Sequence, residues 1–186
     1  MGPVQFLALP KYPMPHDHKE TGYKFCVRCG GRLGLKLVKV GEPERLVCGS
    51  CDYIQYLNPR VASGAIVRQK GKLLLLRRGI EPAYGKWVFP GGFVDAGETL
   101  EGAAIRESME EAGITVSIDG LIGAYSYDGS PVVIIVYAGT IVGGEPRALD
   151  ESIGIAFFDR EEIPWDDLAF PSTRDSLKEY CDRFWR

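Results

Sequence analysis

Three glutamates fall within five residues of one another, at Glu107, Glu110 and Glu111. In a helix the spacing i, i+3, i+4 places all three on one face. Like charges at these spacings destabilise a helix by a few tenths of a kcal/mol per pair, and a divalent cation would offset that repulsion. Ligands that are all oxygen favour Mg²⁺ or Mn²⁺ over zinc. The same pattern also occurs on ordinary solvated helices, so the surrounding residues must decide between the two interpretations.

Two features next to these glutamates favour a built site. Gly91 and Gly92 carry no side chain, so a backbone carbonyl could approach the same cation. Glu98 lies eight residues before Arg106. An ion pair between Glu98 and Arg106 would hold residues 93–97 as a fixed loop beside the carboxylates.

Four of the five cysteines form two CxxC pairs, Cys26 with Cys29 and Cys48 with Cys51. Each pair has glycine beside it, which lets the backbone turn so that both sulfurs face one ion. Four thiolates with no open position predict a structural zinc site rather than disulfides. The alternatives are a redox pair and a site that has lost its metal. Cys181, expected on the core face of the last helix, is given no function.

The elements that must position these groups follow from local patterns. Residues 1–21 are rich in proline and charge and predict an arm, in which His16 and His18 are given no role. Residues 22–57 predict a zinc ribbon with short strands around Leu35, Leu37 and Val40 and around Leu46 and Val47. Residues 58–186 form the main domain, beginning at an Asn-Pro-Arg boundary.

Within the main domain, Thr99 is the expected N-cap and Gly113 the expected C-cap of the helix that carries the glutamates. A second helix is expected at 172–184. The strands are expected at 62–67, 72–76, 87–89, 132–142 and 155–158. Strands, one long helix, more strands and a last helix predict an α/β (α+β) domain, a mixed sheet covered by helices.

Bulk composition excludes some classes of function. The chain has 186 residues, of which 45% are hydrophobic, and its formal net charge is −3. A general nucleic-acid binder should be basic, so nucleic acid is not expected as the main partner. No apolar run is long enough to span a bilayer, and the N-terminus lacks the pattern of a signal peptide. The expected location is the cytoplasm.

The pattern Gly92-x5-Glu98-x7-Arg106-Glu107-x2-Glu110-Glu111-x-Gly113-Ile114 resembles the signature of the Nudix hydrolases. Ser108 departs from it, because the family usually has an aliphatic residue there. The resemblance implies an α/β/α sandwich that hydrolyses nucleoside-diphosphate-linked compounds by water attack on phosphorus. It also implies that Glu107 and Glu111 bind Mg²⁺ or Mn²⁺, supported by Glu110 and the Gly91 carbonyl, while Glu98 and Arg106 orient the site.

A Cys₄ ribbon followed by residues 56–60 and such a domain resembles the subgroup of FAD and ADP-ribose pyrophosphatases. The resemblance implies a structural Zn²⁺, a small nucleotide substrate and a possible homodimer. NADH pyrophosphatase and RNA-decapping activity remain alternatives, as do a non-catalytic nucleotide sensor and a zinc-ribbon nucleic-acid adaptor. The intact set of carboxylates disfavours the sensor.

Residues outside the signature are candidates for the general base and for substrate contacts. Glu151 is the first candidate base and Asp150 the second, although both could be solvated loop acids. Aromatic side chains that could stack on a nucleotide base are Tyr84, Tyr125, Tyr127 and Phe170. Arg77, with Arg78 beside it, could meet phosphates, or could simply end a strand.

Overall fold

A computed structural model describes residues 22–185 of the chain. The predicted arm, 1–21, with its two histidines, lies outside the described residues. The chain divides into two compact units, and the division falls between Asn58 and Pro59.

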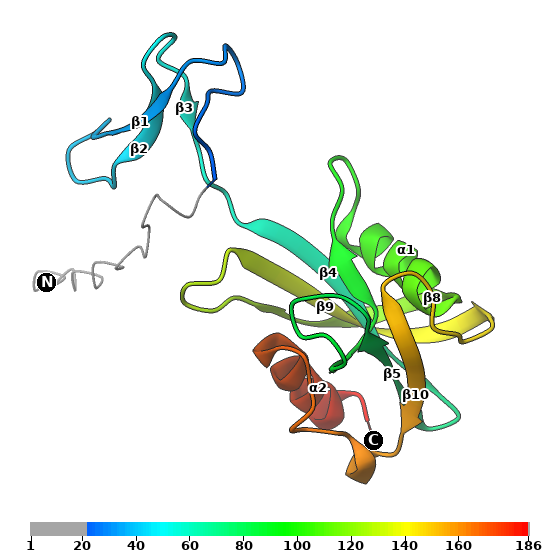
Figure 1. Cartoon of the computed structure of the whole chain (residues 1–186). Coiled ribbons are helices and arrows are strands. Elements are labelled where there is room, and N and C mark those ends of the chain that lie inside the picture. The colour runs from blue at the N-terminus through cyan, green and yellow to red at the C-terminus, as the bar shows by residue number, and fades with distance from the viewer. Residues whose placement is uncertain (1–21, 186) are drawn as a thin grey trace, which may run out of the picture. The chain divides into compact units, whose positions relative to one another are not determined.

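The first unit is a three-stranded antiparallel sheet in the order β1-β2-β3 (Figure 1). Its strands are β1 (Leu33–Lys36), β2 (Arg45–Cys48) and β3 (Ile54–Gln55). The first strand begins earlier than predicted, and Leu37 and Val40 lie beyond its end. The sequence did not predict β3, because two residues are too few to show a period.

The second unit contains a seven-stranded mixed sheet with the central order β10-β5-β4-β9-β8, to which β6 adds beside β5 and β7 beside β4. The strands are β4 (Arg60–Gln69), β5 (Lys72–Arg78), β6 (Trp87–Val88), β7 (Gly91–Phe93), β8 (Ile114–Tyr125), β9 (Val132–Gly144) and β10 (Ser152–Phe158). Strands β4 and β9 run parallel, whereas β5 pairs antiparallel with both β4 and β10.

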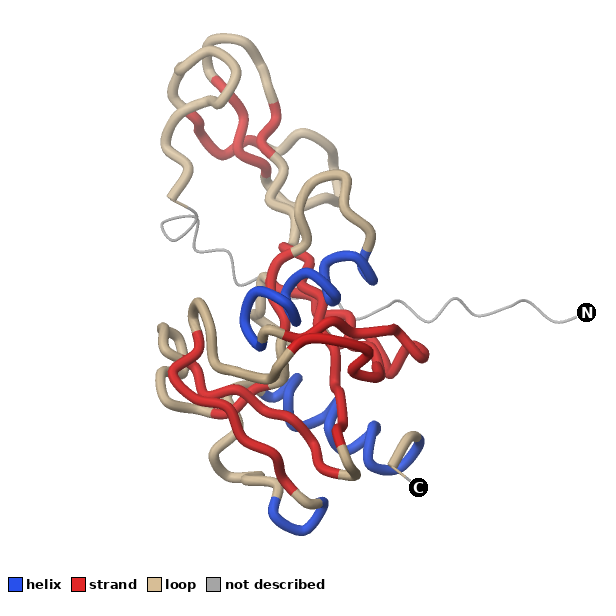
Figure 2. The backbone as a smooth tube through the Cα atoms, turned by 90° about the vertical axis from the view of Figure 1, so that its right-hand side faces the viewer, coloured by secondary structure: helices blue, strands red, loops and turns tan. Residues whose placement is uncertain are grey.

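Two helices cover the two faces of this sheet, as Figures 1 and 2 show: α1 (Leu100–Ala112) and α2 (Pro171–Arg183). The side chains of β5 alternate between the two faces of the sheet and so contribute to the core on each side. Leu73 and Leu75 pack in the core that contains Leu177 of α2, and Leu74 and Leu76 pack in the core that contains Ala104 of α1. The second unit is therefore an α/β/α sandwich with a mixed sheet, as predicted. A 3₁₀ turn, η1 (Arg160–Glu162), precedes α2.

Helix α1 begins and ends as its sequence predicts. The Thr99 side chain accepts a hydrogen bond from the Gly102 N–H, and Gly113 closes the helix in the left-handed conformation at φ 67°. Ser108 is buried, and its hydroxyl donates to the Ala104 carbonyl at 2.7 Å. The polar side chain at this usually aliphatic position is therefore satisfied within the helix.

Strand β8 was not predicted. Apolar and polar side chains alternate from Ile114 to Asp119, but Gly120 and Gly123 interrupt the pattern in the second half of the strand, and its pairing with β9 shifts register three times. A bulge moves side chains from one face to the other, so the pattern along the chain loses the two-residue period. Within the described residues, no helix is long and apolar enough to cross a membrane.

Candidate active site

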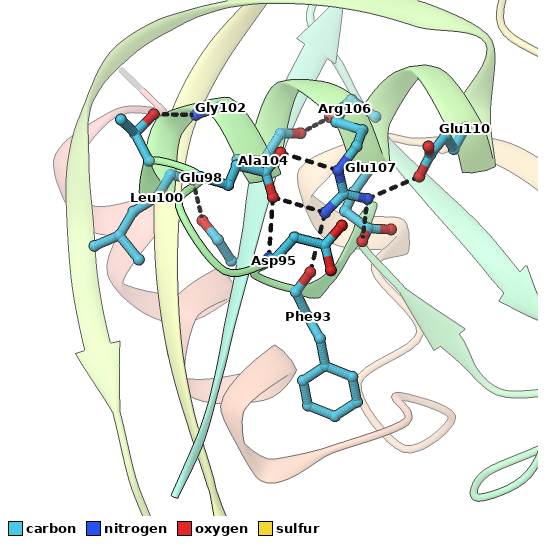
Figure 3. Close-up of polar contacts among 12 residues, drawn as sticks. Phe93, Asp95, Glu98, Leu100, Gly102, Ala104, Arg106, Glu107 and Glu110 are labelled. Atoms are coloured by element: carbon cyan, nitrogen blue, oxygen red, sulfur yellow. Dashed lines mark hydrogen bonds and ion pairs between the residues drawn. The ribbon is translucent and has the colours of Figure 1, made fainter.

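Arg106 is the centre of a polar network at the start of the site (Figure 3). Its Nε lies 3.0 Å from Oε1 of Glu98, and its Nη2 donates to Oε2 of Glu98 and to the Phe93 carbonyl, both at 3.0 Å. The Asp95 N–H donates to Glu98 at 3.2 Å. Because Arg106 binds both oxygens of Glu98, it holds the pKa of that carboxyl below its usual range. The expected ion pair is present, and it fixes the loop between β7 and α1.

The same guanidinium faces two of the three clustered glutamates. Its Nη1 lies 2.7 Å from Glu107 and 2.8 Å from Glu110. One arginine therefore contacts three carboxylates and compensates only part of their negative charge. Glu110 is half-exposed, whereas Glu107 is more buried. Burial raises the pKa of Glu107, although the contact with Arg106 opposes this shift.

Glu111 lies deepest of the three, with only 7% of its surface exposed. Its Oε2 accepts a hydrogen bond of 3.0 Å from the Gly91 N–H. Burial raises the pKa of Glu111 to about 7, and the negative charges of Glu107 and Glu151 add to this effect. A buried carboxyl with two acidic neighbours is stabilised when a cation binds beside it.

The two glycines of strand β7, Gly91 and Gly92, lie very close to atoms of neighbouring elements. A Cβ at Gly92 would overlap the carboxylate of Glu107, and a Cβ at Gly91 would lie 2.7 Å from the Cα of Gly64 on β4. A side chain at Gly91 would meet the backbone of β4, and a side chain at Gly92 would displace the carboxylate of Glu107. The structure thus brings Gly91 to the carboxylates; its carbonyl as a metal ligand stays a prediction.

Glu151 belongs to the same cluster, although it lies 40 residues beyond Glu111 in the chain. Its charge raises the pKa of both Glu107 and Glu111. Its carbonyl accepts the Gly79 N–H at 2.6 Å, and the nearby Leu149 N–H donates to the Glu111 carbonyl at 3.0 Å. These bonds tie the loop before β10 to the end of β5 and to α1. Both Glu151 and Asp150, the second candidate base, are exposed.

The two arginines at the end of β5 have different surroundings. Arg77 lies over the ring of Trp87, which packs against the core under α2, and its Nε donates to the Gly85 carbonyl at 2.9 Å. Arg78 lies over Phe170, donates to the Pro82 carbonyl at 3.0 Å, and lowers the pKa of Glu111 by its charge. Strand alternation accounts for this difference. The structure therefore brings Arg78, rather than Arg77, to the acidic cluster.

The four aromatic side chains predicted to contact the substrate lie in different parts of the domain. Tyr125 donates to Glu179 at 2.9 Å and Tyr127 donates to Asp175 at 2.7 Å, so both tyrosines face α2. Burial raises the pKa of both tyrosines. Tyr84 is exposed in the loop after β5. Phe170 is the one of the four that contacts Arg78, the arginine whose charge lowers the pKa of Glu111.

Sequence reasoning missed one further support. Ser63 on β4 is buried, and its hydroxyl donates to the Leu100 carbonyl at 2.7 Å. This bond anchors the first turn of α1 to the sheet. No local pattern distinguishes Ser63 from any other small residue of a strand.

The family model of the NUDIX domain matches residues 58–180. That range contains the carboxylate helix, the loop that Arg106 fixes, Arg78 and Glu151. The chain belongs to the Nudix hydrolase family. It is therefore a hydrolase, and the matched range includes its glutamate cluster.

Relatives of this Nudix hydrolase agree with the assignment. It is 36% identical over 155 residues to an ADP-ribose pyrophosphatase of Methanocaldococcus jannaschii, which covers 81% of this chain and 86% of the relative. It is 28% identical to the NAD-capped RNA hydrolase NudC of Chromobacterium violaceum, over 87% of this chain but only 59% of that protein. A Nudix hydrolase structure from Nitrosomonas europaea superposes with a TM-score of 0.82 at 36% identity, covering 87% of this chain and 92% of that one.

The first unit of this Nudix hydrolase holds the four paired cysteines together. Their sulfurs all lie within 4.8 Å of one another, and the Sγ atoms of Cys29 and Cys48 are 3.5 Å apart. Tetrahedral zinc with bonds of about 2.3 Å separates its sulfurs by roughly 3.8 Å. The Ser50 N–H donates to Cys48 and lowers the pKa of that thiol to about 6. The family model named Nudix N-terminal, a zinc ribbon, matches residues 24–57. The cluster has the donors and the spacing that zinc requires.

Proposed function

We propose that this Nudix hydrolase is a Mg²⁺- or Mn²⁺-dependent pyrophosphohydrolase whose first candidate substrate is ADP-ribose. The observation that carries the proposal is the arrangement of Glu107, Glu111 and Glu151, three acids near enough for their charges to raise the pKa values of the first two. Folding brings these carboxylates together at a cost, and a divalent cation with a diphosphate would offset it. The similarity to the ADP-ribose pyrophosphatase supports the choice of substrate.

Glu107 and Glu111 would hold the cation, with Glu110 beside them and the Gly91 carbonyl as a further ligand. When bound, the cation neutralises phosphate oxygens and favours ionisation of a water. Glu98 and Arg106 keep the loop and the helix in register, so that the carboxylates do not move when charge changes. A thiolate zinc ribbon suits a reducing compartment, and we place the enzyme in the cytoplasm.

Glu151 would take a proton from the attacking water. It reaches the cluster from the loop before β10, which is bonded to β5 and α1 and is therefore fixed. The oxygen of water forms a new bond to phosphorus, the bridging P–O bond breaks, and ADP-ribose yields AMP and ribose 5-phosphate. Arg78 would pair with a phosphate, while Phe170 behind it offers an aromatic face.

A hydrolysis screen of the full-length protein tests the proposal. ADP-ribose, FAD, NADH and NAD-capped RNA are each incubated with Mg²⁺ or Mn²⁺, and the products are separated by chromatography. AMP released from ADP-ribose faster than from the other compounds is the expected result. Preference for FAD, NADH or capped RNA would reject the substrate and keep the reaction. Absence of cleavage of every compound with either cation would reject the reaction itself.

Replacement of Glu151 by glutamine should lower kcat about a hundredfold, because a general base contributes about 10²- to 10⁴-fold. Asp150→Asn is the matched control and should change kcat less than about twofold. Steady-state kinetics with ADP-ribose measure both variants. A Glu151→Gln variant with the kcat of the parent would show that another group is the base.

Arg78→Gln should reduce kcat/KM about ten- to a hundredfold, mostly through KM, because a charged hydrogen bond contributes about 1.5–3 kcal/mol. Arg77→Gln is a close control, since Arg77 also bonds a carbonyl of the loop after β5 and also lies over an aromatic ring. It should change kcat/KM less than about threefold. Equal losses in the two variants would mean that both arginines act only by holding the loop.

A further inference from the structure

One face of the zinc-ribbon sheet carries only basic and aromatic side chains at its exposed positions, and the pairing register shows which ones. Directly opposed residues of antiparallel strands point to the same face. Phe25 pairs with Arg32, and Lys36 pairs with Arg45. Arg32 and Lys36 are four residues apart in one extended segment, so they share this face. Tyr56 follows the pair Leu46–Gln55 and lies opposite Arg45.

Side-chain contacts agree with this register. The guanidinium of Arg32 lies 5.2 Å from the ring centroid of Phe25, and that of Arg45 lies 5.6 Å from the ring centroid of Tyr56. Phe25 and Tyr56 are 54% and 55% exposed. Gly34, between Arg32 and Lys36, leaves open space above the sheet, where an added Cβ would meet no atom within 4 Å. We call this surface the stacking face; its residues are Phe25, Arg32, Gly34, Lys36, Arg45 and Tyr56.

The cations of the stacking face are incompletely neutralised within the described residues. Arg32 makes no ion pair there, Lys36 reaches Asp52 only at 3.9 Å, and Arg45 reaches Glu42 only at 3.8 Å. The Nε of Arg45 is buried without a hydrogen-bond partner in this part of the chain. The Arg45 side chain is 29% exposed, and an anion bound at its accessible end would offset part of the cost of burying this charge.

The charge of the whole chain conceals this surface. Residues 22–57 contain six basic and three acidic residues, a formal charge of +3, whereas residues 58–186 contain 14 basic and 20 acidic residues, a formal charge of −6. Four thiolates with one Zn²⁺ would reduce the ribbon charge to +1, and two of the three ribbon acids, Asp52 and Glu42, reach Lys36 and Arg45 only at 3.9 and 3.8 Å. The net charge of −3 therefore averages over a basic ribbon and an acidic Nudix domain.

We propose that the stacking face binds single-stranded nucleic acid. Exposed aromatic rings beside arginine provide a surface on which unpaired bases stack, and the cations between the rings meet the phosphates. A flat apolar partner would use the rings but would leave Arg32, Lys36 and Arg45 without anions. A polyanion with stacking bases satisfies both kinds of side chain. The inference concerns the ribbon alone and does not depend on the substrate of the Nudix domain.

Fluorescence anisotropy of the full-length protein with labelled 15-mers of oligouridylate and oligothymidylate, in EDTA-free buffer without Mg²⁺, tests the proposal. Binding of both oligomers with a micromolar Kd that weakens with salt is expected, and binding of oligouridylate alone would narrow the ligand to RNA. Phe25→Leu keeps an apolar side chain but removes the ring, and should weaken binding about five- to a hundredfold, the equivalent of about 1–3 kcal/mol per stacked base.

A matched pair of lysines tests the face itself. Lys36→Gln removes a charge from the stacking face and should weaken binding and reduce the slope of log Kd against log salt by about 0.7. Lys24 lies one residue before Phe25 and so on the opposite face, and Lys24→Gln should change neither quantity. The zinc content of each variant shows that the ribbon is folded.

Several outcomes would overturn the proposal. These are no binding of either oligomer at 100 micromolar protein (roughly the weak end of the non-specific range), and equal effects of Lys24→Gln and Lys36→Gln. A third is a Phe25→Leu variant that binds normally but sediments as a monomer where the parent protein is a dimer. That result would make the face a contact between two copies of the chain. None of these outcomes bears on hydrolysis by the Nudix domain.

Discussion

Glu111→Gln is expected to reduce hydrolysis at least about a thousandfold while leaving the fold intact. Glutamine has the same size and can still accept the hydrogen bond from the Gly91 N–H, but it supplies no charge to a divalent cation. Loss of this ligand removes about 4 kcal/mol or more of transition-state stabilisation, and each 1.36 kcal/mol is a factor of ten in rate. Initial rates with ADP-ribose over a wide range of Mg²⁺ and Mn²⁺ concentrations measure the loss.

The same substitution should make the metal-free protein more stable at alkaline pH. Burial raises the pKa of Glu111 in the folded state to about 7 from an ordinary value of 4.5. The unfolded chain therefore holds fewer protons than the folded chain between these two values, and stability falls as pH rises through them. Above pH 7 the ionised, buried carboxylate costs about 3 kcal/mol, and glutamine removes that cost.

Urea unfolding in EDTA measures this effect through tryptophan fluorescence, because all three tryptophans, Trp87, Trp165 and Trp185, belong to the Nudix domain. At pH 8 the variant should be more stable than the parent by about 2–3 kcal/mol, and at pH 4.5 the two should nearly coincide. Glu145→Gln, an exposed acid, is the control and should show no such difference. Full activity in Glu111→Gln, or equal stabilities at pH 8, would contradict the assigned environment of Glu111.

The carboxylate helix could be predicted because its determinants are local. The cap at Thr99, the left-handed glycine at Gly113 and the spacing of the glutamates all lie within one segment. The ion pair between Glu98 and Arg106 spans only eight residues and one turn of loop. Such features depend only on residues close by in the chain, so they can be predicted without knowing the rest of the fold.

The residues that surround this helix in the fold could not be predicted from local sequence. Glu151 reaches Glu111 because β10 pairs antiparallel with β5 and brings its preceding loop to Gly79. That register depends on the whole sheet. The parallel pairing of β4 with β9 and the bulges of β8 are likewise tertiary. The choice between Arg77 and Arg78 needs only the face of one strand, but the face that α1 covers is known only from the structure.

Removal of zinc is expected to have a second large effect, because the hydrophobic core of the ribbon is too small to keep residues 22–57 folded without a metal. Its buried hydrophobic residues among those described are Cys26, Leu46, Val47 and Cys48, two of which are predicted ligands. Units of this size need a metal or disulfides. Structural zinc contributes about 10–16 kcal/mol to such units near neutral pH, far more than these four buried side chains supply. Removal of zinc should therefore unfold residues 22–57.

The substitution Cys48→Ser should remove the zinc most completely, since Cys48 is fully buried and its thiol has a lowered pKa. The variant should contain less than about a tenth of a zinc per chain, against one in the parent. Its ribbon amides should collapse to random-coil shifts in NMR spectra, while the Nudix domain, with a core of its own, keeps its urea midpoint and its hydrolysis of a small substrate. Cys181→Ala removes the remaining cysteine and should retain the zinc. A zinc-free Cys48→Ser variant with a dispersed ribbon spectrum would show that the sheet folds without metal, and that the four sulfurs play another role.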